Sequence, residues 1–264
     1  MLRLRLNFLL TPLLTLSLVA CQTSPTGRHQ IIMISDAEMS QLGAASFSQM
    51  KSSNPPIEDS KLTIYVECLS RPLLLAAGEN PSEWEVKVFK DATPNAFALP
   101  GKKIGVHTGM IGLTSNSGQL AAVIGHEIAH VQAKHGAERV SLNMASQAVQ
   151  QATAIAVNGK EYSSAAMAAV GLGAQYGVIL PYSRTHESEA DFIGLKIMAK
   201  AGFDPEQAVS LWQTMGKSGG SKPPEFLSTH PASSTRIKQL SAAMLEAKKL
   251  QRTNVTSKVS CIKP

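Results

Sequence analysis

Apolar residues at helical spacing dominate the middle of this chain. The most regular run is 120–131, where Leu, Val and Ile recur three or four residues apart and Ala or Gly fills most positions between them. A helix that is apolar on every side is normally buried. Apolar and polar residues alternate over 84–88, and two further β-prone segments follow at 95–99 and 103–108. The pattern predicts an α+β fold that is mostly helical, with a small antiparallel sheet.

Capping residues bound the predicted helices. Ser35, with a glutamate three residues later, forms a capping-box pattern that opens a helix ending near residue 52. Ser115 or Ser117 can cap the apolar helix, and His135 with the glycine after it can end it. Further helices are expected over about 59–77, 182–202 and 204–217, and from residue 230 onward.

The apolar helix carries three polar side chains, His126, Glu127 and His130. Burying ionisable groups without partners is costly, so these residues need a reason to be there. Residues four apart lie one above the other on a helix, so the two histidines can offer nitrogens to one metal ion. Glu127 lies about a third of a turn away, where it can reach a water on that metal. The spacing is the H-E-x-x-H pattern of zinc peptidases, which also occurs by chance.

A catalytic zinc site needs a third protein ligand besides two histidines. The candidates by residue type are His107, His135, His186, Glu187, Glu189, Asp191 and His230. Helical phase places Glu187 and Asp191 at the border of the inward face, and Glu189 on the opposite side with two lysines. Phase therefore predicts Glu187 as the ligand and Asp191 as the acceptor of the second N–H of a ligand histidine. The alternative for Glu187 is a helix-start carboxylate stabilised by the macrodipole.

At this point the chain resembles a known family. The sequence His-Glu-Ile-Ala-His at 126–130, followed by Glu-Ser-Glu-Ala-Asp at 187–191, is similar to the gluzincin pattern. More narrowly, it resembles the zinc metallopeptidase family that holds HtpX, the CAAX prenyl endopeptidase and the BepA-type periplasmic proteases, and within it the LoiP-like outer-membrane lipoprotein proteases. The resemblance covers about residues 83–240. It implies a zincin-like catalytic domain, placed here at 35–250, with one Zn²⁺ per chain held by His126, His130 and Glu187.

The reaction implied is peptide-bond hydrolysis, in which Glu127 takes a proton from the zinc-bound water and passes it to the leaving amine. By resemblance, His230 stabilises the oxyanion, assisted by Arg236; the alternative is that His230 only caps the last helix. The segment Asn95, Ala96, Phe97 and Ala98 resembles the family's edge strand, which would pair with an extended substrate through its backbone. The histidines at 107, 135 and 186 are expected to be structural or on the surface.

The first residues are typical of an export signal. Two arginines precede a short apolar stretch that ends in Leu-Val-Ala before Cys21. Small residues before a cysteine resemble a bacterial lipobox, which predicts a signal peptide at 1–20, lipidation of Cys21 and a lipid-proximal tether over 21–34. Gln22 after the cysteine favours the outer membrane of a Gram-negative cell, with the protein on its periplasmic face. The alternatives are an ordinary cleaved signal and an uncleaved anchor, although the apolar stretch is short for a membrane span.

Charge is uneven along the chain. The formal net charge of +6 becomes +4 once the two arginines of residues 1–20 are removed. The region from Arg236 onward holds seven Lys or Arg residues and one acid, so the rest is slightly acidic. A basic tail at 251–264 can meet lipid phosphates, although a solvated helix and a frayed end explain it as well. An exported lipoprotein is not expected to bind nucleic acid. The Ala-rich segment 141–180 is expected to be a soluble hairpin or a lid rather than a membrane span.

Two cysteines remain after Cys21, namely Cys68 and Cys261. In an oxidising compartment an even remainder suggests a disulfide, which here would tie the carboxyl terminus to an early helix. Two unpaired thiols are the alternative.

These features predict a zinc metalloendopeptidase that acts on unfolded or misassembled envelope proteins as quality control. Expected partners are protein or peptide substrates, the membrane through lipidated Cys21, and envelope protease or assembly machinery. One alternative is a non-proteolytic zinc-binding lipoprotein that acts as a chaperone or assembly factor for outer-membrane proteins. An intact Glu127 argues against it, because metal ligation alone does not require that residue. Another alternative is a structural lipoprotein with an accidental motif.

Overall fold

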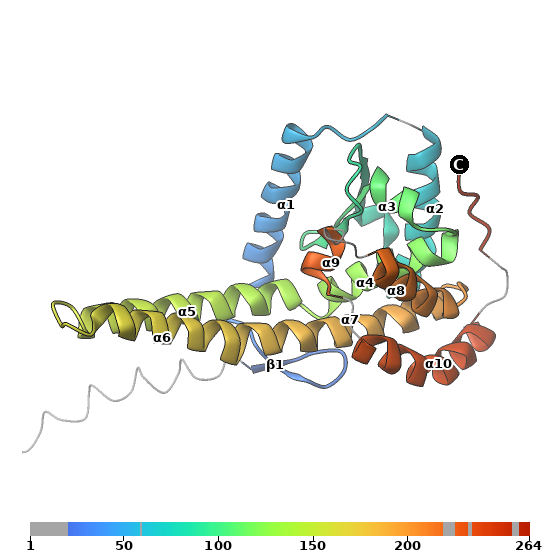
Figure 1. The fold of residues 1–264 in the computed structure, drawn as a ribbon. Helices are drawn as coiled ribbons and strands as arrows, with labels where there is room; N and C mark the ends of the chain where they lie inside the picture. The colour runs from blue at the N-terminus through green and yellow to red at the C-terminus, as the bar shows by residue number, and fades with distance from the viewer. Residues whose placement is uncertain (1–20, 59, 219–224, 232–233, 255–258) are drawn as a thin grey trace, which may run out of the picture.

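The computed structural model describes residues 21–58, 60–218, 225–231, 234–254 and 259–264 (Figure 1). The predicted signal peptide lies outside these residues. The helices are α1 (Asp36–Ser53), α2 (Ser60–Ala76), α3 (Thr108–Leu113), α4 (Ser117–Gln132), α5 (His135–Ala156), α6 (Ser163–Ala174), α7 (Leu180–Lys200), α8 (Glu206–Ser218), α9 (Glu225–Thr229) and α10 (Ser234–Asn254). The strands are β1 (Cys21–Thr23), β2 (His29–Ile31), β3 (Glu85–Phe89), β4 (Ala96–Leu99) and β5 (Lys103–His107). The predicted α+β, mostly helical class is confirmed.

Helix α4 is the centre of the core, as its apolar pattern predicts. Every residue from Gln119 to Ala129 is buried. Helices α2, α7 and α8 pack around it, and α10 packs on the outer side of α7. The crossing of α4 with α7 is very close, because a Cβ added at Gly194 would lie 2.9 Å from the backbone nitrogen of His126. This glycine therefore allows α7 to bring its side chains against the polar residues of α4.

The helix ends predicted from the sequence are correct at the start of α1 and wrong at both ends of α4. Ser35 caps α1 through the predicted capping box. The side chain of Asn116, rather than Ser115 or Ser117, caps α4. Helix α4 also ends earlier than expected, because Lys134 adopts a left-handed conformation with φ 52°. The chain turns back there, so His135 starts α5 instead of ending α4.

The core sheet has three strands in the order β3-β5-β4. Strand β4 runs antiparallel to β5, as expected for a small antiparallel sheet, whereas β3 pairs in parallel with β5 and makes the sheet mixed. The parallel pairing arises because the chain leaves β3, forms β4, and returns through the turn at 100–102 between the other two strands. Strand β4 therefore lies at the edge of the sheet, next to α4.

The segment 21–34, expected to be a lipid-proximal tether, is folded against the body of the protein. Strands β1 and β2 form an antiparallel hairpin, and β2 packs against α5. Ser24 and Gln30 are buried, and the Arg28 side chain reaches carboxylates of α5 and α7. Strands of three residues are too short for an alternation of apolar and polar residues to be recognised in the sequence.

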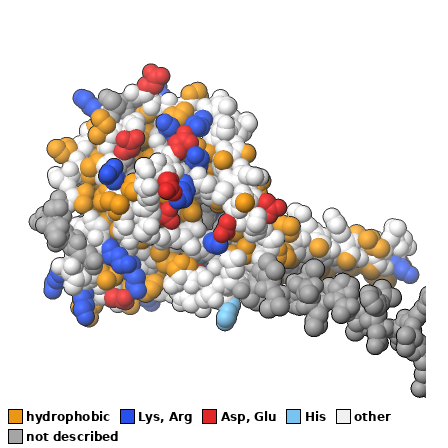
Figure 2. Space-filling view, turned by 180° about the vertical axis from the view of Figure 1, so that it is seen from behind, with side chains coloured by type: hydrophobic (Ala, Val, Ile, Leu, Met, Phe, Trp, Pro, Cys, Tyr) orange, Lys and Arg blue, Asp and Glu red, His pale blue; other side chains and the backbone are white. Residues whose placement is uncertain are grey.

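The Ala-rich segment 141–180 forms a helical hairpin that projects from the body (Figure 1). It consists of most of α5, α6 and a π-helical turn over Gln175–Ile179 that leads into α7. Side chains on the visible face of this arm are largely uncharged (Figure 2). Its base, including Leu142 and Ile179, lines the cleft described below, while its far end projects away from that cleft. In the described part of the chain no helix is long and apolar enough to cross a membrane.

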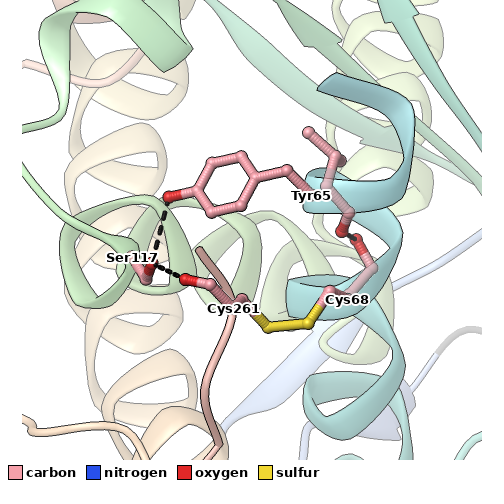
Figure 3. Close-up of a disulfide and its surroundings, with 6 residues drawn as sticks. Tyr65, Cys68, Ser117 and Cys261 are labelled. Atoms are coloured by element: carbon pink, nitrogen blue, oxygen red, sulfur yellow. Dashed lines mark hydrogen bonds between the residues drawn. A yellow bond between two sulfur atoms is a disulfide. The ribbon is translucent and has the colours of Figure 1, made fainter. Parts of the chain in front are cut away.

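The carboxyl terminus is tied back to the body rather than frayed. Cys68 on α2 and Cys261 form a disulfide at a sequence separation of 193 (Figure 3). Ser117 donates a hydrogen bond to the carbonyl oxygen of Cys261 at 2.6 Å and accepts one from the Tyr65 hydroxyl at 3.2 Å. Lys263 donates to the carbonyl of Thr114 at 2.6 Å. The basic tail predicted over 251–264 therefore includes the last turn of α10 and a segment held against α2 and α4.

Candidate metal centre

Two elements bring the predicted ligands together. Helix α4 carries His126 and His130 one turn apart, and α7 crosses it with Glu187 facing them. The Glu187 carboxylate lies 3.3 Å from His126 Nε2 and 3.5 Å from His130 Nε2. The two histidine Nε2 atoms are 3.1 Å apart. The structure thus places all three predicted ligands in one group.

His230, a candidate ligand by residue type that the resemblance assigned to the oxyanion, belongs to the same group. Its Nδ1 lies 3.0 Å from Glu187 Oε2 and 3.2 Å from His126 Nε2. One donor atom from each of His126, His130, Glu187 and His230 lies within 4.8 Å of all the others. The Phe226 ring stacks on His230 at 4.5 Å between centroids, which holds this histidine over the site. Only tertiary structure brings residue 230, on the loop after α9, to helix α4.

The group fits a metal ion. Two imidazole nitrogens and a carboxylate oxygen are the donors of gluzincin-type zinc sites. The two imidazole nitrogens lie 3.1 Å apart, close enough to bind one cation together. In the described part of the chain, the buried Oε1 of Glu127 has no hydrogen-bond partner, and His230 Nε2 lies 3.4 Å from it. An unpaired carboxylate oxygen beside such a group is available to accept a proton from bound water.

The charges of the group suit metal binding. Burial holds the pKa of His130 well below its ordinary value, so this ring is neutral. Burial would raise the pKa of Glu187, but contacts with His126 and His230 hold it far below its usual range, so it is a carboxylate. Burial would lower the pKa of His126, but Asp191 and Glu187 outweigh it and raise that pKa to about 9. A cation therefore competes with one proton at His126.

Glu127 has the electrostatics of a general base. Burial raises the pKa of its carboxyl, which brings that pKa closer to pH 7. Its Oε2 lies 3.4 Å from the backbone nitrogen of Ala98 on β4. The carboxylate therefore lies between the metal group and the edge strand.

Asp191 occupies the predicted place beside a ligand histidine. Its Oδ1 lies 3.1 Å from Nδ1 of His126. Burial would raise the pKa of Asp191, but the contacts with Arg236 and His126 outweigh it and lower that pKa. Arg236 donates to both oxygens of Asp191 and also lies 3.0 Å from Glu187 Oε2. Its link to His230 is indirect, through a 3.0 Å hydrogen bond to the Pro231 carbonyl. A carboxylate on the second nitrogen makes Nε2 the nitrogen of His126 that can ligate once its proton is displaced.

Sequence phase placed Glu189 wrongly with respect to solvent. Glu189 is buried rather than on the surface, and it accepts hydrogen bonds from the N-terminal hairpin. His135 and His186 are also buried, which is the structural one of the two positions that the sequence left open for them. The phase argument assumed that the side of α7 opposite the core faces solvent, but the hairpin covers it. The chain turn at Lys134 then brings His135 back beside His130.

A cleft of about 770 Å³ passes along the group. Its walls are α1, β4, the base of the arm and the start of α7, with Glu127, His130, Glu187 and His230 at its floor. The backbone carbonyl of Asn95 accepts a hydrogen bond from the backbone N–H of His107. Because hydrogen-bonded and non-hydrogen-bonded pairs alternate along an antiparallel pair of strands, the backbone N–H and C=O groups of Ala96 and Ala98 point away from β5, toward the outer edge of the sheet. The Phe97 ring instead packs over Gly105. Of the predicted segment, the backbone of Ala96 and Ala98 is directed toward the cleft.

Comparison with known proteins agrees with this geometry. A family model, "Peptidase family M48", matches residues 60–244. The mitochondrial metalloendopeptidase OMA1 of Schizosaccharomyces pombe is 35% identical over 194 residues, which cover 73% of this chain and 56% of that protein. The beta-barrel assembly-enhancing protease of Yersinia pestis is 31% identical over 212 residues, covering 76% of this chain and 43% of its own length. The corresponding Escherichia coli K12 protein is 28% identical over 204 residues, 75% of this chain and 42% of its own length. The chain thus spans about half the length of these relatives.

Proposed function

Because the chain belongs to peptidase family M48, we propose that it is a zinc metalloendopeptidase. The observation that carries the proposal is the group formed by His126, His130 and Glu187 beside an unpaired oxygen of the buried Glu127. Relatives named metalloendopeptidase and protease support hydrolysis of peptide bonds. This chain spans only about half the length of these relatives, so their activity is a proposal for this chain.

His126, His130 and Glu187 would hold one Zn²⁺. A bound ion would supply Lewis-acid chemistry there, polarising the scissile carbonyl and making a water molecule more acidic. Glu127 then accepts a proton at its free Oε1 and delivers it to the leaving amine. His230 Nε2, which lies 3.4 Å from Glu127 Oε1, can donate to the oxyanion of the substrate. Arg236 positions the loop of His230 through the Pro231 carbonyl.

The substrate would bind as an added strand on β4. The outward backbone groups of Ala96 and the carbonyl of Ala98 offer hydrogen bonds to an extended peptide along the cleft, while the Ala98 N–H donates to Glu127. Main-chain recognition places few demands on side chains, so we expect broad specificity and a preference for unfolded segments. A folded substrate would have to release a strand before the cleft accepts it.

The cellular setting is proposed on separate grounds. The lipobox-like sequence before Cys21 supports lipid anchoring to the outer membrane, with the catalytic domain in the periplasm. Envelope protein quality control agrees with a preference for unfolded chains, and two relatives are named for β-barrel assembly. Incorporation of radiolabelled palmitate tests the anchor: the parent should be labelled and Cys21→Ala should not. Labelling of both proteins, or of neither, would contradict lipidation at Cys21.

The test of activity uses the purified full chain. We expect one zinc per chain by metal analysis and cleavage of β-casein, a largely unfolded protein. Glu127→Gln should keep the zinc and lose at least about 100-fold in rate, because the amide cannot accept the proton. Glu187→Ala should lose zinc and activity together. A chain that binds zinc and protects an aggregating barrel protein without any cleavage would instead indicate the non-proteolytic chaperone.

A further inference from the structure

A second group of polar side chains lies buried next to the proposed ligands. It consists of His135, Glu138, His186 and Glu189, joined by Ser24, Arg28 and Gln30 of the N-terminal hairpin. Glu138 and Glu189 are 0% and 6% exposed. Ionised groups are rarely buried so deeply unless each of them is paired. Nothing in the proposed reaction uses this group directly, so its presence needs a separate explanation.

The hairpin supplies most of the partners of Glu189. Arg28 donates from Nε to Glu189 Oε2 at 2.8 Å, and the hydroxyls of Ser24 and Thr26 donate to Oε1. The same guanidinium donates to both oxygens of Glu138 at 2.9 and 2.8 Å. Arg28 therefore joins the hairpin to α5 through Glu138 and to α7 through Glu189.

His135 connects this buried group to the metal ligands. Its Nε2 lies 3.1 Å from Glu189 Oε2, and its Nδ1 lies 2.9 Å from Nδ1 of His130. A carboxylate can only accept, so the proton of neutral His135 belongs on Nε2 and its Nδ1 is an acceptor. His130 must then carry its proton on Nδ1. The Nε2 of His130, which faces His126 and Glu187, is left with a free lone pair for a metal ion.

We propose that His135 is a positioning residue that fixes the tautomer of His130 for metal binding, and that the N-terminal hairpin is a necessary part of this arrangement. The inference deepens the proposed metal centre and rests on it. Glu189 orients His135, and the hairpin holds Glu189. The two ligand histidines are thus oriented differently: His126 by a direct contact with Asp191, and His130 by a carboxylate acting through a second imidazole. The hairpin that follows Cys21 is thus connected to His130 through Arg28, Glu189 and His135.

The first test measures zinc affinity by competition with a chromophoric chelator. His135→Phe removes the acceptor for His130 Nδ1–H and should weaken zinc binding about 10- to 100-fold. The matched control is His29→Phe, because it makes the same replacement at an exposed position of β2 outside the buried group. The control should change the zinc affinity less than about threefold. Equal affinities of the parent and His135→Phe would overturn the proposal.

A second measurement needs no variant. Two-bond ¹H–¹⁵N correlation of the zinc-loaded parent, labelled at histidine nitrogens, reports which ring nitrogen of each histidine carries a proton. We expect His135 to be protonated at Nε2 and His130 at Nδ1. A proton on Nδ1 of His135 would overturn the proposal even if His135→Phe fails to fold.

The role of the hairpin has its own test. Replacing Ser24 with Ala and Thr26 with Val removes two donors to Glu189 and leaves Arg28 in place. Zinc affinity should fall by about 3- to 10-fold, whereas the control His29→Ala, an exposed residue of β2, should leave it unchanged. An unchanged affinity in the double variant would overturn the part played by the hairpin. If the parent itself bound no zinc, the proposed function would fail, which is a different outcome from either of these.

Discussion

Arg236 donates from Nε and Nη2 to the two carboxylate oxygens of Asp191, at 2.6 and 2.7 Å. Both side chains are almost fully buried, and the guanidinium lies 3.9 Å from the centre of the Trp212 ring. Asp191 in turn lies against His126. The pair therefore couples α10, at the far end of the chain, to the first proposed metal ligand.

Arg236→Lys should weaken zinc binding about tenfold, because a lysine cannot donate to both oxygens at once and leaves Asp191 free to rotate away from His126. Unfolding by urea should show a loss of about 2 kcal/mol, since a buried pair becomes incompletely bonded. The control is Lys238→Arg, an exposed position two residues along α10. Zinc affinity equal to that of the parent would show that Asp191 does not need Arg236.

Zinc affinity should depend on pH through His126. Its pKa of about 9 means that the ring is protonated at pH 7, so a binding ion must displace that proton. Affinity should therefore fall as the pH falls below about 9, by up to about tenfold per unit. Titration calorimetry at pH 7, in buffers of different ionisation enthalpy, should detect about one proton released per zinc. An affinity independent of pH between 6 and 8 would contradict the electrostatics described here.

His230→Ala should retain zinc, because three donors remain, and should lower kcat by about 10- to 1,000-fold through loss of the oxyanion donor. The measurements are zinc content and casein cleavage on the same sample. A control on the stacked neighbour, Phe226→Leu, tests whether positioning alone accounts for the effect. A rise in kcat would show instead that His230 occupies the position that water or substrate needs, as its closeness to the ligands allows.

Gly194→Ala should destabilise the protein by about 1–3 kcal/mol, because the added methyl meets the backbone of His126. Zinc affinity should fall as well, since α7 would move away from α4 and carry Glu187 with it. Gly171→Ala on α6, where nothing lies within 4 Å, is the matched control and should be neutral or slightly stabilising. Thermal unfolding with and without zinc distinguishes the two effects.

Reduction of the Cys68–Cys261 disulfide should lower stability by about 2–5 kcal/mol, because a link across 193 residues restricts the unfolded chain strongly. Cys68→Ser should behave like the reduced parent in urea, and adding reductant to the variant should change nothing further. Zinc content should be unaffected, since the link lies on α2 away from the ligands. Alkylation of the unreduced parent that labels both thiols would contradict the bond.

The sequence determined the parts of this protein that depend on neighbours along one helix. The apolar period of α4 predicted a buried helix, and the four-residue spacing placed His126 and His130 on one side of it. Phase along α7 separated Glu187 from Glu189 correctly with respect to the metal group. These inferences succeed because helical geometry converts sequence distance directly into direction.

Tertiary structure alone decided which surfaces were covered and which distant residues met. The side of α7 that carries Glu189 faces the N-terminal hairpin rather than water. The sequence around Glu189 does not indicate a partner that lies more than 160 residues away along the chain. A single left-handed residue, Lys134, turned His135 back toward His130. His230 reached the ligands through the packing of Phe226 against it. The period of apolar residues shows which face of a helix can be buried in the core. Whether another segment covers the opposite, polar face depends on how the whole chain folds.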